Sequence, residues 1–202
     1  MTASLTPAHR PLDPRSKDHR ALERAGLLPL PVAPPPPPHV PLHLVEAEGQ
    51  LQVHTASYRG SFSSVLSQAV RSAGLGSRVL IVQFLKGGVE QGPAKRVQIC
   101  GGLTWLRPDV PACVETSDHP GAADAVADVW QFCQQSLLEG DLDHLVLDEV
   151  GLAIGLGYLK EQDLIEALQQ RPGSMDVIIT GPSIPSRVME MADQVTELRR
   201  GF

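Results

Sequence analysis

Hydrophobic and polar positions alternate along the chain in blocks that predict strands and helices in turn. Short runs rich in valine, isoleucine and leucine predict six strands, at residues 51–54, 78–84, 103–107, 144–148, 176–180 and 195–199. Runs of this kind are apolar on both faces, so each strand is expected to be buried on both sides. That pattern is typical of a parallel sheet covered by helices.

The segments between the predicted strands have the spacing of amphipathic helices. Two apolar stripes stand out, one formed by Val126, Val129, Trp130, Cys133 and Leu137 and the other by Leu164, Ile165 and Leu168. Gly140, and Pro172 with Gly173, are suitable points for helices to end. This alternation predicts an α/β fold of three layers with a mainly parallel sheet. In such folds the ligand crevice lies at the C-terminal ends of the strands.

Residues 1–43 differ in composition from the rest of the chain. They carry most of the prolines, including an unbroken run from Pro34 to Pro38, and five Lys or Arg residues against three Asp or Glu residues. Proline removes backbone donors and favours extended polyproline II structure. We therefore predict a disordered tail, with at most a short helical turn at 20–28, followed by one domain at 44–202. The alternative is that the tail is a docking peptide for an SH3-like groove.

Charge and cysteine content narrow the class of protein. The net charge of −6 argues against a nucleic-acid surface. The three cysteines, Cys100, Cys113 and Cys133, form no C-x-x-C pair, which predicts reduced thiols of an intracellular protein rather than a disulfide framework or a zinc site. Residues 1–10 lack the apolar segment of a signal peptide, and no run of 18 apolar residues occurs. We expect a cytoplasmic protein that does not span a membrane.

Several segments, in this order along the chain, resemble the P-loop corrinoid adenosyltransferases. Residues 78–88 are similar to the second-strand motif of that family, and residues 115–118 resemble its W-E-T-x-D segment, with Val114 in place of the tryptophan. Residues 145–150 resemble its Walker B strand, and residues 171–181 with 191–199 resemble its last helix–strand–helix–strand run. The resemblance starts near Gln50. It implies a P-loop NTPase-like fold and a reaction that transfers the 5′-deoxyadenosyl group of ATP to cob(I)alamin or a related corrinoid.

In the frame of that family, seven residues occupy the phosphate-binding loop: Ala56, Ser57, Tyr58, Arg59, Gly60, Ser61 and Phe62. A working loop reads G-x-x-x-x-G-K-[ST], because glycine amides wrap the phosphates, the lysine neutralises them and the hydroxyl holds magnesium. Here Ala56 replaces the first glycine, Ser61 the lysine and Phe62 the hydroxyl residue. Arg59 is the one cation left, and its planar group fits phosphate differently from lysine. We predict that the loop keeps its architecture but no longer binds ATP, with the side chain of Tyr58 or Phe62 turned into the site.

Further candidates come from the ends of other predicted strands. Asp148 and Glu149 end the Walker B-like strand, where such a carboxylate orders magnesium in a working enzyme. The alternative is that this acidic pair faces solvent or caps the next helix. Lys86 is placed to reach an anion, and its alternative is a solvated turn. The resemblance adds Glu115 and Asp118 to the crevice.

A second cation of the family is missing after the fifth predicted strand. The family commonly has Thr-Gly-Arg there, whereas this chain has Thr180, Gly181 and Pro182. Proline has neither a charge nor an amide donor. Triphosphate binding is therefore expected to be weaker by orders of magnitude.

Three functional hypotheses remain. The first is an active ATP:corrinoid adenosyltransferase of cobalamin biosynthesis or salvage with an unusual phosphate loop, for which the family implies ATP, magnesium and a corrinoid. The second is a non-catalytic paralogue, a pseudoenzyme with a binding or regulatory role toward a corrinoid or a protein partner. The third is a scaffold with no ligand in the crevice. The losses in the loop favour the second hypothesis. The residues alone assign no cofactor and no catalytic residue, and a homodimer is the default assembly that the family implies.

Overall fold

The computed structural model describes residues 48–60, 62–99 and 101–199. All of them belong to one compact unit, Val45–Phe202. The predicted tail at 1–43, with its helical turn at 20–28, lies outside the described residues, as does Ser61 of the phosphate loop. The predictions for those parts, and the boundary at residue 44, therefore stay predictions.

The described residues form a seven-stranded sheet with the order β3-β4-β2-β5-β6-β1-β7. Its strands are β1 (Leu51–Ala56), β2 (Arg78–Gln83), β3 (Val97–Ile99), β4 (Gly102–Leu106), β5 (His144–Asp148), β6 (Asp176–Thr180) and β7 (Gln194–Leu198). All neighbouring strands pair in parallel except β3 and β4, which are antiparallel. The predicted mainly parallel sheet is confirmed, and all six predicted strands are present within a residue or two of their expected bounds.

Strand β3 is an element that the sequence pattern did not predict. It has only three residues, and all three are exposed at the edge of the sheet. A strand this short does not show the alternation of apolar and polar positions from which strands are recognised. It is an addition to the predicted topology and does not change the fold class.

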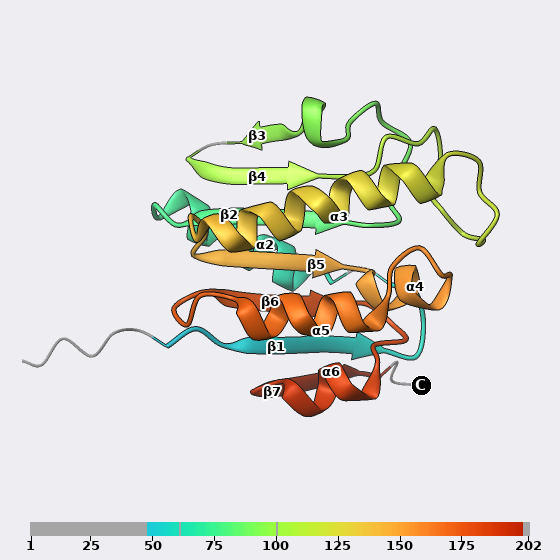
Figure 1. Cartoon of the computed structure of the whole chain (residues 1–202). Helices are drawn as coiled ribbons and strands as arrows, with labels where there is room; N and C mark the ends of the chain where they lie inside the picture. The colour runs from blue at the N-terminus through green and yellow to red at the C-terminus, as the bar shows by residue number, and fades with distance from the viewer. Residues whose placement is uncertain (1–47, 61, 100, 200–202) are drawn as a thin grey trace, which may run out of the picture. The chain divides into compact units, whose positions relative to one another are not determined.

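Helices cover both faces of the sheet, which makes the fold three-layered as predicted (Figure 1). Helix α2 (Ser63–Gly74) lies on one face and buries Val65, Ala69 and Ala73 in a small apolar cluster. Helices α3 (Ala122–Glu139), α5 (Glu161–Gln170) and α6 (Ser186–Met191) lie on the other face, over a larger cluster. The short helix α4 (Val150–Gly155) follows β5, and a 3₁₀ turn, η1 (Pro93–Lys95), precedes β3.

The predicted helix faces and ends agree with the structure. The apolar stripes of α3 and α5 are the residues that these helices bury. Helix α3 ends at Gly140, whose φ of 66° lies in the left-handed region that glycine tolerates best. Helix α5 ends just before Arg171 and Pro172. Among the described residues, no helix has the length and apolar character needed to cross a bilayer.

The arrows of the parallel strands point the same way, so their C-terminal ends share one edge of the sheet (Figure 1). The loop that follows β1 and the residues that follow β5 therefore meet at this edge. In parallel α/β sheets this edge carries the ligand crevice. The sequence therefore brings the predicted site residues to the edge where the fold favours a site.

Candidate functional site

A row of polar side chains crosses four neighbouring strands at the C-terminal edge of the sheet. Gln83 of β2 is in register with Asp148 of β5, Asp148 with Thr180 of β6, and Thr180 with His54 of β1. Successive residues of a strand face opposite sides, so the row shares the face of Ile81, Val146 and Ile178, which pack in the cluster under α2. Gln83, Asp148 and Thr180 are 4%, 5% and 0% exposed.

Both oxygens of the Asp148 carboxylate accept hydrogen bonds within this row. Gln83 Nε2 donates to Oδ2 at 2.8 Å, and Thr180 Oγ1 donates to Oδ1 at 2.7 Å. Burial raises the pKa of Asp148, and the two hydrogen bonds oppose that rise. Uncharged donors therefore satisfy this carboxylate, and the alternative in which it faces solvent is wrong.

Gln83 also joins Asp148 to Trp105 of β4 and to Arg107, the residue that follows this strand. Its Oε1 atom accepts a hydrogen bond from Trp105 Nε1 at 3.0 Å and another from Arg107 Nε at 2.9 Å. The amide orientation that places Nε2 on Asp148 is thus the one that places Oε1 on these two donors. Gln83, Trp105 and Arg107 were not among the predicted site residues. The available signal was a polar glutamine directly after four buried apolar residues of β2.

Glu149, the residue after Asp148, is satisfied by cations instead. Its side chain is 1% exposed, and the guanidinium of Arg59 binds it in a bidentate manner, with Nε–Oε1 at 2.7 Å and Nη2–Oε2 at 2.8 Å. Lys86 Nζ lies 3.2 Å from the same Oε1. The hydrogen bond to Glu149 raises the pKa of Arg59, and partial burial opposes the rise. Arg59, Lys86 and Glu149 come from three distant segments, and we call them the ion-pair cluster.

The backbone around Glu149 is fixed as tightly as its side chain. Glu149 has a φ of 64°, an uncommon value for a residue with a Cβ atom, and its N–H donates to Thr180 O at 2.8 Å. Gly181, at a φ of 122°, packs on it so closely that an added Cβ would lie 3.1 Å from Glu149 Cα. Glu149 occupies the N-cap position of α4 but makes no side-chain cap hydrogen bond. The alternative in which the acidic pair caps the next helix is therefore wrong for this side chain.

The phosphate loop leads into α2 with a bulky residue at the start of the helix. Phe62 is the N-cap residue, and its side chain is 4% exposed within the apolar cluster under α2. The ring of Tyr58 lies against Gly60, because a Cβ added to that glycine would come 2.7 Å from Tyr58 Cε2. Ala56 is buried at the end of β1, whereas Ser57 is exposed. Phe62 is therefore buried in the apolar cluster at the start of α2. That Tyr58 or Phe62 is turned into the phosphate site stays a prediction.

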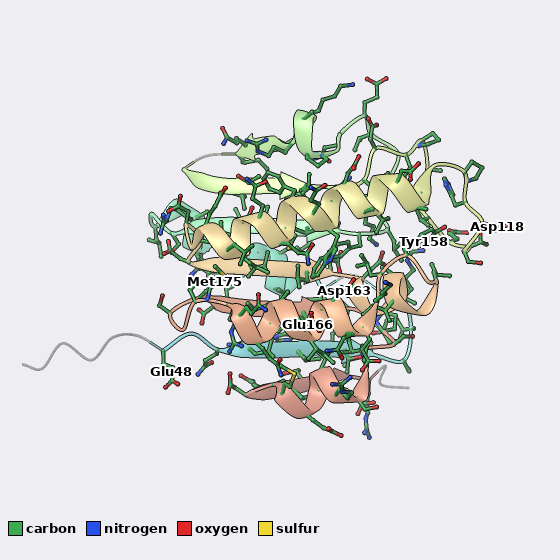
Figure 2. All side chains as sticks on the ribbon, in the orientation of Figure 1. Glu48, Asp118, Tyr158, Asp163, Glu166 and Met175 are labelled. Carbon is green, nitrogen blue, oxygen red and sulfur yellow. The ribbon has the colours of Figure 1, made fainter. Side chains whose placement is uncertain are left out.

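The two candidates of the 115–118 segment differ in their relation to the cluster. Both Glu115 and Asp118 are exposed. The charge of Glu115 acts on Arg59 and helps to raise its pKa. The pKa of Asp118 is lowered first by a hydrogen bond with Thr116, and this residue lies on the outer loop that leads to α3 (Figure 2). Tyr158 ties that loop to the segment after α4, since its hydroxyl donates to Thr116 O at 2.6 Å.

The donor set at this edge does not fit a resident magnesium ion. Both oxygens of Asp148 are already hydrogen-bonded, and Glu149 is held by two cations that would repel a divalent ion. Within the described ranges, no group of three or more His, Cys, Asp or Glu side chains is arranged to hold a metal. Magnesium also needs several oxygen ligands in near-octahedral geometry. The site can instead present partly shielded positive charge, because two cations share one carboxylate.

Comparison with known proteins gives one consistent result. Residues 47–201 match the model of a family described as ATP:corrinoid adenosyltransferase BtuR/CobO/CobP. The corrinoid adenosyltransferase of Escherichia coli K12 is 30% identical over 162 residues, which cover 76% of this chain and 78% of that protein. The corrinoid adenosyltransferase CobA of Salmonella typhimurium is 32% identical over the same shares of the two chains. The corrinoid adenosyltransferase of Pseudomonas aeruginosa is 29% identical, over 76% of each chain.

Proposed function

The chain belongs to the ATP:corrinoid adenosyltransferase family, and we propose that it is a non-catalytic member, which binds a corrinoid or a protein partner without transferring an adenosyl group. The observation that carries this proposal is the ion-pair cluster. Arg59 lies in the phosphate loop and Lys86 in the loop after β2, and both are bound to Glu149.

Adenosyl transfer from ATP requires the protein to hold and neutralise a triphosphate leaving group. The lysine and hydroxyl of the family loop are replaced by Ser61 and Phe62, and the arginine after the fifth strand of the family is replaced by Pro182. A hydrogen bond to a charged group contributes roughly 1.5–3 kcal/mol, so the loss of two cationic contacts weakens binding by roughly two to four orders of magnitude. This loss of affinity supports the proposal that the crevice does not bind ATP.

A contact between Arg59 and a phosphate would not restore the binding free energy that the two lost cations supplied. The carboxylate of Glu149 is 1% exposed, and it would lose its bidentate partner when Arg59 turned away. Leaving a buried charge without its partner costs about 3–5 kcal/mol. Arg59, the cation that the loop still carries, is thus needed to stabilise the folded protein. For this reason we favour a role in binding a corrinoid or a protein partner over catalysis.

The second candidate function is an active adenosyltransferase with an unusual phosphate loop. One observation favours it: the ion-pair cluster holds two cations and one carboxylate, so one positive charge is in excess. A triphosphate that displaced Glu149 would meet both cations. This route predicts that Glu149→Gln, which removes the competing charge, strengthens ATP binding and increases turnover.

Calorimetric titration with Mg-ATP, with cobalt–carbon bond formation followed by absorbance, separates the two candidates. The E. coli relative is the positive control under the same conditions. We expect no saturable binding of Mg-ATP and no turnover in this protein, and saturation with turnover in the control. A micromolar dissociation constant for Mg-ATP, or turnover, would establish the active enzyme instead. Titration with hydroxocobalamin then tests the corrinoid as the ligand, and its failure leaves the protein partner.

A further inference from the structure

A hollow of about 250 Å³ lies against the edge of the sheet formed by β4 and β3. Its walls are mainly apolar and come from Val89, Gln91, Val97, Ile99, Trp105 and Arg107. Strand β4 is two strands away from β5, which carries Asp148. The hollow is smaller than the roughly 300–1,000 Å³ of sites for drug-sized ligands, so it suits a small molecule or one end of a larger one.

Exposed aliphatic side chains gather on one side of this edge. Val89, Val97 and Ile99 are 46%, 48% and 39% exposed. Val97 is in register with Trp105 of β4 and Ile99 with Leu103, so these side chains share the face on which Trp105 packs. Gln98, which alternates with them, lines a different hollow with Thr104. The apolar surface is therefore continuous from the indole of Trp105 to the sheet edge.

Arg107 supplies a positive charge beside this apolar surface. Its Nε atom donates to Gln83 Oε1 at 2.9 Å, and its guanidinium carbon lies 5.7 Å from the centroid of the Trp105 ring. None of the ion pairs formed among the described residues includes Arg107. Glu90, the acidic residue of the hollow, is paired with Lys95 at 3.0 Å.

The hydrogen bonds of Gln83 fix both recognition elements in place. Its Oε1 atom holds the indole N–H of Trp105 and the Nε of Arg107 together, and Gln83 itself is 4% exposed. A ring and a cation that are held before a ligand arrives lose little conformational entropy when it binds. The arrangement is therefore preorganised for a ligand that has an apolar part and an anionic part.

We propose that this hollow binds a small amphipathic anion. The apolar body, aromatic or aliphatic, rests on Trp105, Val97 and Ile99, and a carboxylate, sulfonate or phosphate group contacts the guanidinium of Arg107. Charge complementarity selects this class of ligand, because an apolar ligand leaves Arg107 unpaired and a polar anion leaves the apolar wall exposed. The site is separate from the ion-pair cluster and does not depend on whether the crevice binds ATP.

Two fluorescent probes with the same aromatic body test the proposal. The probe 1-anilinonaphthalene-8-sulfonate carries an anionic group, and N-phenyl-1-naphthylamine does not. We expect the sulfonate probe to bind the native full-length chain more tightly and to quench the emission of Trp105. Arg107→Gln should weaken the sulfonate probe roughly tenfold, as expected for the loss of one charge-assisted contact, and leave the neutral probe unchanged. Arg107→Lys should keep part of the preference, and Trp105→Phe should remove the quenching.

Controls make each outcome decisive. Leu75→Ser and Leu138→Ser remove apolar side chains that are 86% and 74% exposed elsewhere on the surface, and they should leave both probes unaffected. A melting curve of each variant establishes whether that variant is folded. The proposal is overturned if neither probe binds, if Arg107→Gln leaves the sulfonate probe unchanged, or if the control variants weaken binding equally. Sedimentation completes the test: self-association that Val97→Asp abolishes, without probe binding, would make this face a contact between copies and overturn the ligand site.

Discussion

The two adjacent carboxylates at the end of β5 are satisfied in opposite ways. Asp148 is buried within the polar row and accepts hydrogen bonds from the uncharged Gln83 and Thr180, whereas Glu149 is buried in the ion-pair cluster with Arg59 and Lys86. The polar row depends on the register of neighbouring strands, which the fold sets. The ion-pair cluster depends on charges brought from three separate segments.

This difference separates two kinds of contact at this edge. The contacts of Asp148 are set by the strand order of the fold, and those of Glu149 by the charged side chains that this chain carries. A buried carboxylate needs donors, and the sheet itself places neutral ones beside Asp148. Glu149 lies beyond the strand, where Arg59 and Lys86 reach it from loops. Arg59 meets that need, which ties the phosphate loop to the end of β5. The same contact pairs the loop cation with a carboxylate of the protein, which is the basis of our proposal that this cation does not bind ATP.

The largest expected effect comes from breaking the ion-pair cluster. We expect Arg59→Ala to lower the free energy of unfolding by about 3 kcal/mol, the lower end of the range for a broken buried pair, because Lys86 still contacts Glu149. Urea unfolding measures this. The matched control is Arg78→Ala, which removes exposed pairs with Asp141 and Asp143 and should cost at most about 1 kcal/mol. Equal losses in the two variants would show that the buried pair has no special role.

Replacing the residue at the start of α2 should have the next largest effect. Phe62 is 4% exposed, so Phe62→Thr should lower the free energy of unfolding by about 2 kcal/mol through lost apolar burial. Leu75→Thr, at an 86% exposed position after the same helix, should change it by less than about 0.5 kcal/mol.

An activity assay on a double variant tests whether the loop can still bind a nucleotide. Ser61→Lys combined with Phe62→Thr restores the family residues but not the glycines that let backbone amides wrap a phosphate. We expect no cobalt–carbon bond formation with ATP and reduced corrinoid. Turnover in this double variant, with an unchanged melting temperature, would contradict the proposal that the protein is non-catalytic.

A smaller effect is expected within the polar row. Thr180→Val keeps the shape of a fully buried side chain but removes one donor to Asp148, so the free energy of unfolding should fall by about 1–2 kcal/mol. Thr196→Val on β7, where the threonine is only partly buried, is the matched control and should be near neutral. A neutral Thr180→Val would indicate that Asp148 does not depend on the row.

The smallest effect concerns pH and the other end of the polar row. Burial lowers the pKa of His54 below the ordinary value of 6.5. As the pH falls through 6.5 the unfolded chain takes up a proton before the folded one does, so stability is lost from there downward through the folded pKa. Unfolding free energies between pH 7 and pH 5 should therefore decline more steeply in the native protein than in His54→Gln. Parallel slopes would mean that His54 titrates alike in both states.

The sequence predicted the parts of the molecule that local pattern encodes. Strands β5 and β6 were predicted with their observed bounds, because their apolar runs are flanked by clear polar ends. The alternation of elements also placed the loop after β1 and the acidic pair after β5 at the same edge. Strand β3 was missed, since three exposed residues carry no periodic signal.

The partners of the site residues could not be predicted in the same way. Lys86 was assigned either to an anion or to a solvated turn, yet it contacts Glu149, which lies 63 positions later in the printed sequence. Gln83 was seen only as part of a strand motif, although it joins Trp105, Arg107 and Asp148. Contacts of this kind depend on strand order and side-chain direction, which a single sequence does not state.

A double-mutant cycle on Arg59 and Glu149 measures how strongly these two side chains stabilise each other in the folded protein. We propose that the loop cation satisfies the buried carboxylate and is for that reason not available to ATP. Unfolding free energies of the native protein, Arg59→Ala, Glu149→Ala and the double variant give the coupling between the two side chains. We expect a coupling of about 2 kcal/mol or more, so that the double variant loses less stability than the sum of the losses in the two single variants. Additivity within about 0.5 kcal/mol would contradict this expectation.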